Sequence, residues 1–203
     1  MQSLEKRRNK AQENRETILK AAISLFQKYG FENVTIDEIG KEAGFSRGTV
    51  YKLFVSKEDL VVSYMVQWNR LYENYYHEEI EHSEQNVLEK IRSLTQYMLS
   101  ASTKGGQAFQ RIAIASGMKD ELLAEKISKS NASITKIFQD LLSYGQSEGL
   151  ISSAYSVSEL IEMIYIVLEG LCLRWAGSYN DRSLEEISGP ALNILIETLK
   201  NKN

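Results

Sequence analysis

The stretch of sequence that decides the fold is residues 35–60, TIDEIGKEAGFSRGTVYKLFVSKEDL. Thr35 and Glu38 have the spacing of a capping box, in which each side chain accepts a hydrogen bond from a free backbone N–H at the start of a helix. Gly44 is a typical helix stop, because glycine readily adopts the left-handed conformation that ends a helix. The pattern therefore predicts a short helix over residues 36–43.

A second short helix follows this glycine. Ser46 is a good N-cap, and the helix that it starts extends to about Leu53. Ser56 and Asp59 repeat the capping pattern and predict the start of a long helix. Two short helices that flank a glycine turn are typical of a helix-turn-helix, whose second helix enters the major groove of DNA.

The second short helix carries polar side chains that suit DNA. Arg47 can donate two hydrogen bonds to a guanine edge, Thr49 can bond a base or contact a thymine methyl group, and Gly48 permits close approach of the backbone. Hydroxyl groups, lysines and helix ends at the margins of the motif suit phosphates. The complete predicted DNA-binding set is Thr35, Ser46, Arg47, Gly48, Thr49, Tyr51, Lys52 and Lys57.

Helical patterns continue on both sides of this motif. With one proline and 12 glycines in 203 residues, little interrupts them, and the fold class predicted is all-α. We expect about nine helices, in a head over residues 1–56 and a body over 57–203, with residues 1–11 as a flexible tail. Apolar spacing, caps and glycines predict the other helices at about 12–29, 57–80, 85–102, 106–116, 120–147, 157–176 and 184–201.

The charges are divided unevenly along the chain. Of the 24 Lys and Arg and the 27 Asp and Glu, 11 and 9 lie in residues 1–60, so a slightly positive head precedes an acidic body. Cys172 is the only cysteine and cannot form a disulfide within the chain. No apolar run approaches the roughly 20 residues that span a bilayer, so we expect a cytoplasmic protein without membrane contact.

Residues 15–60 resemble the DNA-binding head of the TetR family of bacterial transcriptional regulators. The family pattern is A-x-x-L-F-x-x-x-G-[FY] followed by T-[ITV]-x-x-I-A-x-x-A-G-[VF]-S-x-G-x-[LIV]-Y-x-[HY]-F-x-[SN]-K-x-x-L, and nearly every position is present. Gly40 departs from the usual alanine, which costs up to about 1 kcal/mol of helix stability, and Leu53 departs from the usual aromatic or histidine. The resemblance implies a repressor that an effector releases from DNA by shifting the helix that begins at residue 57.

The body is expected to form a homodimer. One head reads too few base pairs for useful specificity, so such modules act as two-fold dimers on palindromic half-sites about 34–36 Å apart. The last two predicted helices carry more apolar residues than one core requires, and the resemblance implies a four-helix interface, although these stripes could also close the core of the monomer. The predicted interface residues are Leu160, Ile164, Leu168, Leu171, Ile187, Ala191, Ile194 and Leu195.

Aromatic side chains concentrate between the head and the last two helices. The resemblance implies that an effector binds among such helices, and the side chains predict a small hydrophobic or amphipathic molecule. Aromatic residues at helical spacing can equally well be core packing. The candidate ligand-binding residues are Tyr64, Trp68, Tyr72, Tyr97, Phe109, Phe138, Tyr165 and Glu169.

Other classes of function have less support in the sequence. His77, His82 and Cys172 offer no evident pairing of nucleophile and base, so we predict no enzyme and no cofactor. Glu78 and His82 are four residues apart, but His77 and His82 point differently on a helix, so no metal site is predicted. A nucleoid-type structural DNA binder would have a more basic head.

Overall fold

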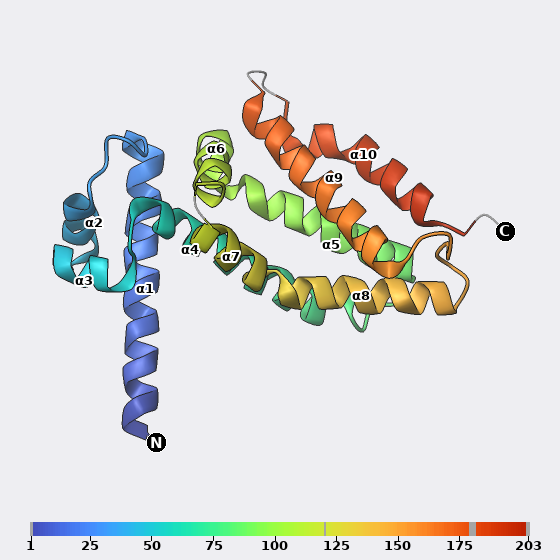
Figure 1. The fold of residues 1–203 in the computed structure, drawn as a ribbon, viewed down its shortest axis with the longest axis horizontal. Helices are drawn as coiled ribbons and strands as arrows, with labels where there is room; N and C mark the ends of the chain where they lie inside the picture. The colour runs from blue at the N-terminus through green and yellow to red at the C-terminus, as the bar shows by residue number, and fades with distance from the viewer. Residues whose placement is uncertain (1, 120, 179–181, 202–203) are drawn as a thin grey trace.

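The computed structural model describes residues 2–119, 121–178 and 182–201, and these form ten α-helices (Figure 1). The prediction of an all-α fold is confirmed. An antiparallel bridge between Ile151 and Lys200 joins the loop after α8 to the segment that follows α10. The elements are α1 (Gln2–Tyr29), α2 (Ile36–Ala43), α3 (Arg47–Leu53), α4 (Lys57–Tyr75), a π-helical turn (Tyr76–Ile80), α5 (Val87–Ser102), a 3₁₀ turn (Thr103–Gly105), α6 (Gly106–Gly117), α7 (Glu121–Ser130), α8 (Ala132–Ser147), α9 (Val157–Gly177) and α10 (Leu184–Leu199).

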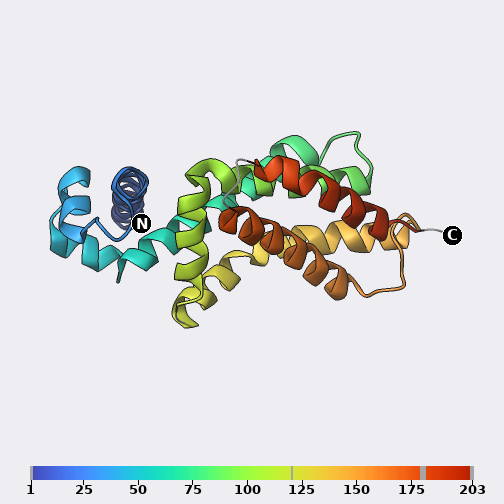
Figure 2. The same ribbon diagram turned by 90° about the horizontal axis from the view of Figure 1, so that it is seen from above.

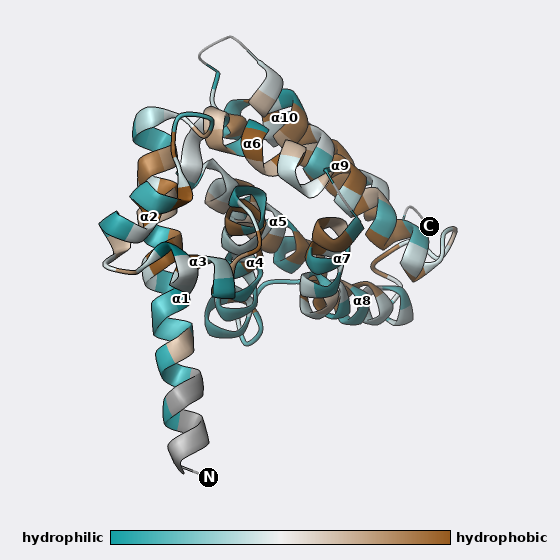
Figure 3. Ribbon diagram, turned by 60° about the vertical axis from the view of Figure 1, so that its left-hand side comes forward, coloured by the Kyte–Doolittle hydropathy of each residue, from teal (hydrophilic) through white to brown (hydrophobic). Residues whose placement is uncertain are grey.

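The helices form two groups that α4 connects. Helices α1 to α3 make a small head at one end, and α5 to α10 make the body, as the two perpendicular views show (Figure 1, Figure 2). The start of α4 packs in the head and its remainder lies in the body. In Figure 3 hydrophobic residues follow α9 and α10. No described helix is both long and apolar enough to cross a membrane.

The first helix is longer than predicted. It begins at Gln2, so residues 2–11 are helical in the structure, where the sequence predicts a flexible tail over residues 1–11. This segment is charged but lacks glycine and proline, and side-chain pairs one turn apart support it. Lys10 contacts Glu13 at 3.4 Å, and Gln12 donates to Glu16 at 2.8 Å.

The helix predicted over residues 120–147 is two helices, which turn at Asn131. The side-chain amide of Asn69 on α4 donates to Ser130 Oγ and to Asn131 Oδ1, both at 2.8 Å. These polar side chains therefore bond to α4 at the turn, in a segment whose residues readily form local alternatives to helix. The helix predicted to reach residue 80 likewise ends as α4 at Tyr75, and a π-helical turn completes it.

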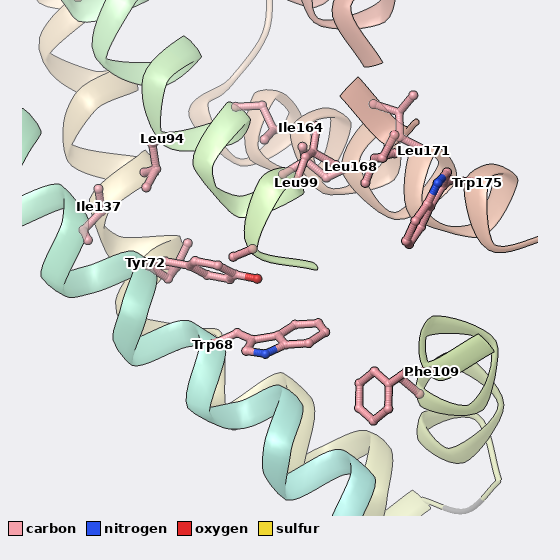
Figure 4. Close-up of a cluster of buried hydrophobic side chains, with 14 of the residues drawn as sticks. Trp68, Tyr72, Leu94, Leu99, Phe109, Ile137, Ile164, Leu168, Leu171 and Trp175 are labelled. Carbon is pink, nitrogen blue, oxygen red and sulfur yellow. The ribbon is translucent and has the colours of Figure 1, made fainter. Parts of the chain in front are cut away.

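The interior of the body is filled by large apolar side chains. In Figure 4 Trp68 and Tyr72 of α4, Phe109 of α6 and Trp175 of α9 converge on the same region. All four are at most 6% exposed. Ring contacts between Trp68 and Phe109, with centroids 6.1 Å apart, join α4 to α6. The body is thus packed against α4 along most of its length.

Candidate DNA-binding head and its connection to the body

The two short helices of the head are capped as their sequence predicts. Thr35 Oγ1 accepts from the Glu38 N–H at 3.2 Å, and the Glu38 carboxylate accepts from the Thr35 N–H at 2.8 Å. Hydrogen bonds from the backbone and hydroxyl of Thr35 lower the pKa of Glu38. Ser46 Oγ accepts from the Thr49 N–H at 3.2 Å and starts α3. The N-termini of α2 and α3 are therefore both capped by hydrogen bonds between residues three apart in the sequence.

The turn between α2 and α3 is tight. Gly44 has a φ of +75°, the left-handed conformation in which glycine is favoured. The Phe45 N–H then bonds the Gly40 carbonyl at 2.8 Å. A Cβ on Gly40 would lie 2.7 Å from the Phe45 carbonyl oxygen. The glycine that departs from the family pattern thus fits a close contact between α2 and the turn.

The outer face of α3 is open to a partner. Arg47, Gly48, Tyr51 and Lys52 are exposed, whereas Val50 is fully buried. This segregation holds the helix on the head through one face and leaves the polar face free.

Arg47 has only a surface contact in the unbound head. Its guanidinium lies 3.2 Å from the Asp37 carboxylate, with both side chains more than half exposed, and 5.5 Å from the centre of the Tyr51 ring. Exposed ion pairs contribute at most about 1 kcal/mol, so a base could replace Asp37 at little cost. Thr49 is half-buried, and its hydroxyl lies 2.9 Å from Ser46 Oγ, so it is less available than Arg47.

The side chain of Lys57 already makes contacts within the head. Its ammonium donates to the Phe31 carbonyl at 2.8 Å and lies 4.5 Å from the centre of the Phe31 ring. The side chain therefore fastens the start of α4 to the segment between α1 and α2. An ammonium has three donors, so a phosphate contact by Lys57 stays a prediction.

The junction between head and body is a polar network that the sequence does not reveal. Arg15 of α1 donates to the Leu53 carbonyl at 2.7 Å and lies 3.4 Å from Ser63 Oγ on α4. Ser63 also bonds Asp59, and Lys126 of α7 donates to both. The network thus links α1, the end of α3, the first turns of α4, and α7.

Asp59 is the centre of this network. Only 7% of the residue is exposed, and besides Lys126 it accepts from the Val55 N–H at 3.0 Å. A buried carboxylate needs such partners, because its desolvation is costly. Beside it, Glu58 pairs with Lys119 in the turn that follows α6. Two neighbouring acidic residues of α4 are therefore held by lysines of the body.

The aromatic residues predicted to bind an effector are largely core residues in this structure. Trp68, Tyr72, Phe109 and Phe138 are buried and pack within the core of the body, and their contact with an effector stays a prediction. Tyr64 packs edge-on against both Trp68 and Phe109, with centroids 5.8 and 5.4 Å away.

The other three predicted ligand-binding residues are scattered. Tyr165 is half-buried on α9, and its hydroxyl lies 2.9 Å from Thr135 Oγ1. Glu169 is exposed on α9; desolvation and then the nearby Glu162 raise its pKa. Tyr97 of α5 lines a groove of about 500 Å³ between α5 and α10. Of the eight residues, it alone lines this groove.

The residues predicted to form a dimer interface divide into two groups. Ile194 is 69% exposed, and Ile187 and Ala191 are half-buried. The other five are at most 8% exposed and pack in the core of this chain, so their assignment to an interface is corrected: helical periodicity does not distinguish an inward face from a contact face. These five are Leu160, Ile164, Leu168, Leu171 and Leu195. The exposed apolar residues that periodicity did not single out on α9 are Ile166 and Leu173.

Comparison with known proteins agrees with this geometry. Residues 18–64 match the family described as bacterial regulatory proteins, tetR family. The chain is 24% identical over 191 residues to the fatty acid metabolism regulator protein of Bacillus subtilis, covering 91% of this chain and 95% of that one. It is 29% identical over 164 residues to the transcriptional regulator UidR of Escherichia coli, covering 78% and 81% of the two chains.

Solved structures share the fold. The regulator FadR of Bacillus subtilis in complex with stearoyl-CoA superposes with a TM-score of 0.73 at 21% identity, covering 91% of this chain and 98% of that one. A putative regulator from Saccharomonospora viridis in complex with choline gives 0.72 at 19% identity, covering 95% and 100%. The helix-turn-helix, the sequence relatives and the fold agree, and the chain belongs to the TetR family of bacterial transcriptional regulators.

Proposed function

We propose that this protein is a dimeric repressor that binds a palindromic operator through α3 and is released by a small-molecule effector. Residues 1–56 would act as the DNA-binding domain, and residues 57–203 as the effector-binding and dimerisation domain. The observation that carries the proposal is the exposed polar face of α3, with Arg47 held only by a surface ion pair. As a regulator of transcription, the protein would act in the cytoplasm of a bacterium.

Dimerisation would use the outer faces of α9 and α10. Ile166, Leu173 and Ile194 are 60%, 59% and 69% exposed, an unusual concentration of large apolar side chains on two adjacent helices. Gly170 lies one turn from both Ile166 and Leu173, which would let a partner helix approach closely. A two-fold dimer through this face would present two copies of α3 to one DNA duplex.

Release would be transmitted along α4. The far end of this helix packs in the aromatic interior of the body, and its first turn carries Asp59 and Glu58, which lysines of α6–α7 hold. A ligand that prefers a different position of α4 would shift the head away from its DNA-binding geometry. A known structure of this fold holds stearoyl-CoA, which supports an amphipathic effector.

The proposal is tested by selecting genomic fragments that the full-length protein retains, followed by footprinting and light scattering. We expect one enriched sequence with two-fold symmetry, half-sites about one helical turn apart, and a dimer in solution. Retention that does not exceed that of random DNA would refute the proposed operator. A monomer at micromolar concentration, both free and on the enriched fragment, would refute the dimer.

A further inference from the structure

The groove between α5 and α10 has an aromatic wall. Its volume is about 500 Å³, in the range of sites for small molecules. The rings of Tyr75 and Tyr97 stack at its edge, with centroids 3.9 Å apart and planes 9° from parallel. Trp175 and Leu192 add apolar surface from α9 and α10. One part of the groove can thus accept the flat or apolar portion of a ligand.

The α5 side of the groove offers hydrogen-bonding groups that have no partner. Ser93, Gln96 and Ser100 recur at three- and four-residue spacing, so they lie along one face of the helix. None of the three side chains makes a hydrogen bond with the described residues. On the opposite wall, by contrast, Ser188 Oγ already donates to the Glu185 carbonyl at 3.3 Å. A ligand would gain the α5 contacts without breaking bonds within the protein.

The charge of the groove selects against anions. Glu185 is the only ionisable acid or base other than tyrosine among the described residues that line it, and no lysine, arginine or histidine is present there. An anionic head group would give up water and meet a carboxylate, with no cation to compensate. Serine and glutamine side chains instead suit neutral hydroxyl groups, since each can both donate and accept.

The groove also borders on the helix that leads to the head. Tyr97 stacks on Tyr75 and packs edge-on against Tyr72, with centroids 6.2 Å apart, and both partners belong to α4. The Tyr72 hydroxyl lies 3.5 Å from the Met98 carbonyl of α5. A ligand that moves Tyr97 would therefore change the contacts of the second half of α4.

From these features we propose that the groove between α5 and α10 binds a neutral amphiphile with a hydroxyl-rich head group, such as an alkyl or aryl glycoside. The hydroxyl groups bond Ser93, Gln96 and Ser100, and the apolar part lies against Trp175 and Leu192. The evidence for binding of this amphiphile comes from the groove alone. Its effect on DNA rests on the function proposed above.

The test compares three probes that share an eight-carbon chain: octyl β-glucoside, octanoate and octyltrimethylammonium. Calorimetry with the full-length protein, below the micellar concentration of each probe, measures affinity. We expect binding of the glucoside and at least tenfold weaker binding of octanoate, which would meet the Glu185 carboxylate, and of the ammonium compound, which has no hydroxyl group to bond the α5 side chains. Equal or tighter binding of either charged probe would overturn the ligand class.

A substitution locates the site. Ser100 is exposed on α5, so Ser100→Phe places a ring in the groove without disturbing the core, and Ser143→Phe on the exposed side of α8 is the matched control. We expect Ser100→Phe to weaken glucoside binding at least tenfold and Ser143→Phe to leave it unchanged. Equal affinities of the two variants, or no glucoside binding by the unmodified protein, would overturn the site.

Operator binding separates this inference from the proposed function. If both variants retain the selected operator and the glucoside fails to bind, the groove proposal fails while the repressor proposal stands. If calorimetry detects the glucoside in the groove but no operator is found, the repressor proposal fails and the binding site stands. Bound glucoside that leaves operator affinity unchanged would overturn the predicted effect through α4.

Discussion

Replacement of Lys126 by methionine tests the network that joins head and body. The substitution removes the ammonium that bonds Asp59 and Ser63 but keeps most of the alkyl chain. Loss of one partner of a fully buried pair costs about 3–5 kcal/mol, whereas an exposed pair contributes about 0–1 kcal/mol. This pair lies between the two cases, since Asp59 is 7% exposed but the lysine side chain is 32% exposed. Asp59 also keeps its bond from the Val55 N–H.

We therefore expect Lys126→Met to lower the free energy of unfolding by about 2 kcal/mol, as measured by urea denaturation at a fixed protein concentration. Lys136→Met is the matched control, because Lys136 pairs with Asp140 on the surface of α8 with both side chains about 60% exposed. Its loss should not exceed about 0.5 kcal/mol. Equal losses for the two variants would refute the argument that Lys126 holds a buried charge.

Three further substitutions test other parts of the structure. Gly40→Ala should lower operator affinity and fail to raise the melting temperature, because its Cβ would meet the Phe45 carbonyl oxygen at 2.7 Å; a stability gain near 1 kcal/mol with full affinity would contradict the tight turn. Ser46→Ala should cost about 1 kcal/mol in urea denaturation by removing the cap on the Thr49 N–H, and no loss would mean that the cap is redundant. Ile194→Glu should convert the dimer to a folded monomer in light scattering, with unchanged circular dichroism; an intact dimer would place the interface elsewhere.

The parts of the fold that could be predicted from the sequence depend on contacts between near neighbours. The caps at Thr35, Ser46, Ser156 and Ser183 all bond a backbone N–H three residues ahead, which is visible in the spacing alone. The full length of α1 could not be predicted in this way, because the charged residues before Gln12 are typical of a solvated tail, whereas the helix begins at Gln2 and Lys10 pairs with Glu13 along it.

The junction could not be predicted in this way. Asp59 appears in the sequence as an ordinary acidic residue in the first turn of a helix, favoured by the helix dipole. Its partner Lys126 is 67 residues away, and only the packing of α7 against α4 brings the two together.

Periodicity also failed to separate core from surface sites. Trp68 and Phe109 are candidate ligand-binding residues in the sequence, but a ring that fills the core and a ring that lines a cavity have the same spacing in sequence. Ser93 and Ser100, which border the groove, read as an ordinary solvated helix face. These two serines line the groove only because α10 packs beside α5.

The central claim is that α3 reads DNA sequence, and the most direct measurement compares Arg47→Ala on the selected operator and on random DNA. We expect a loss of about 1–3 kcal/mol on the operator and little change on random DNA, because a guanine contact carries sequence information. Arg70→Ala, an exposed arginine in the middle of α4, should change neither affinity. Equal losses on operator and random DNA for Arg47→Ala would contradict the assignment of Arg47 as a base-reading residue.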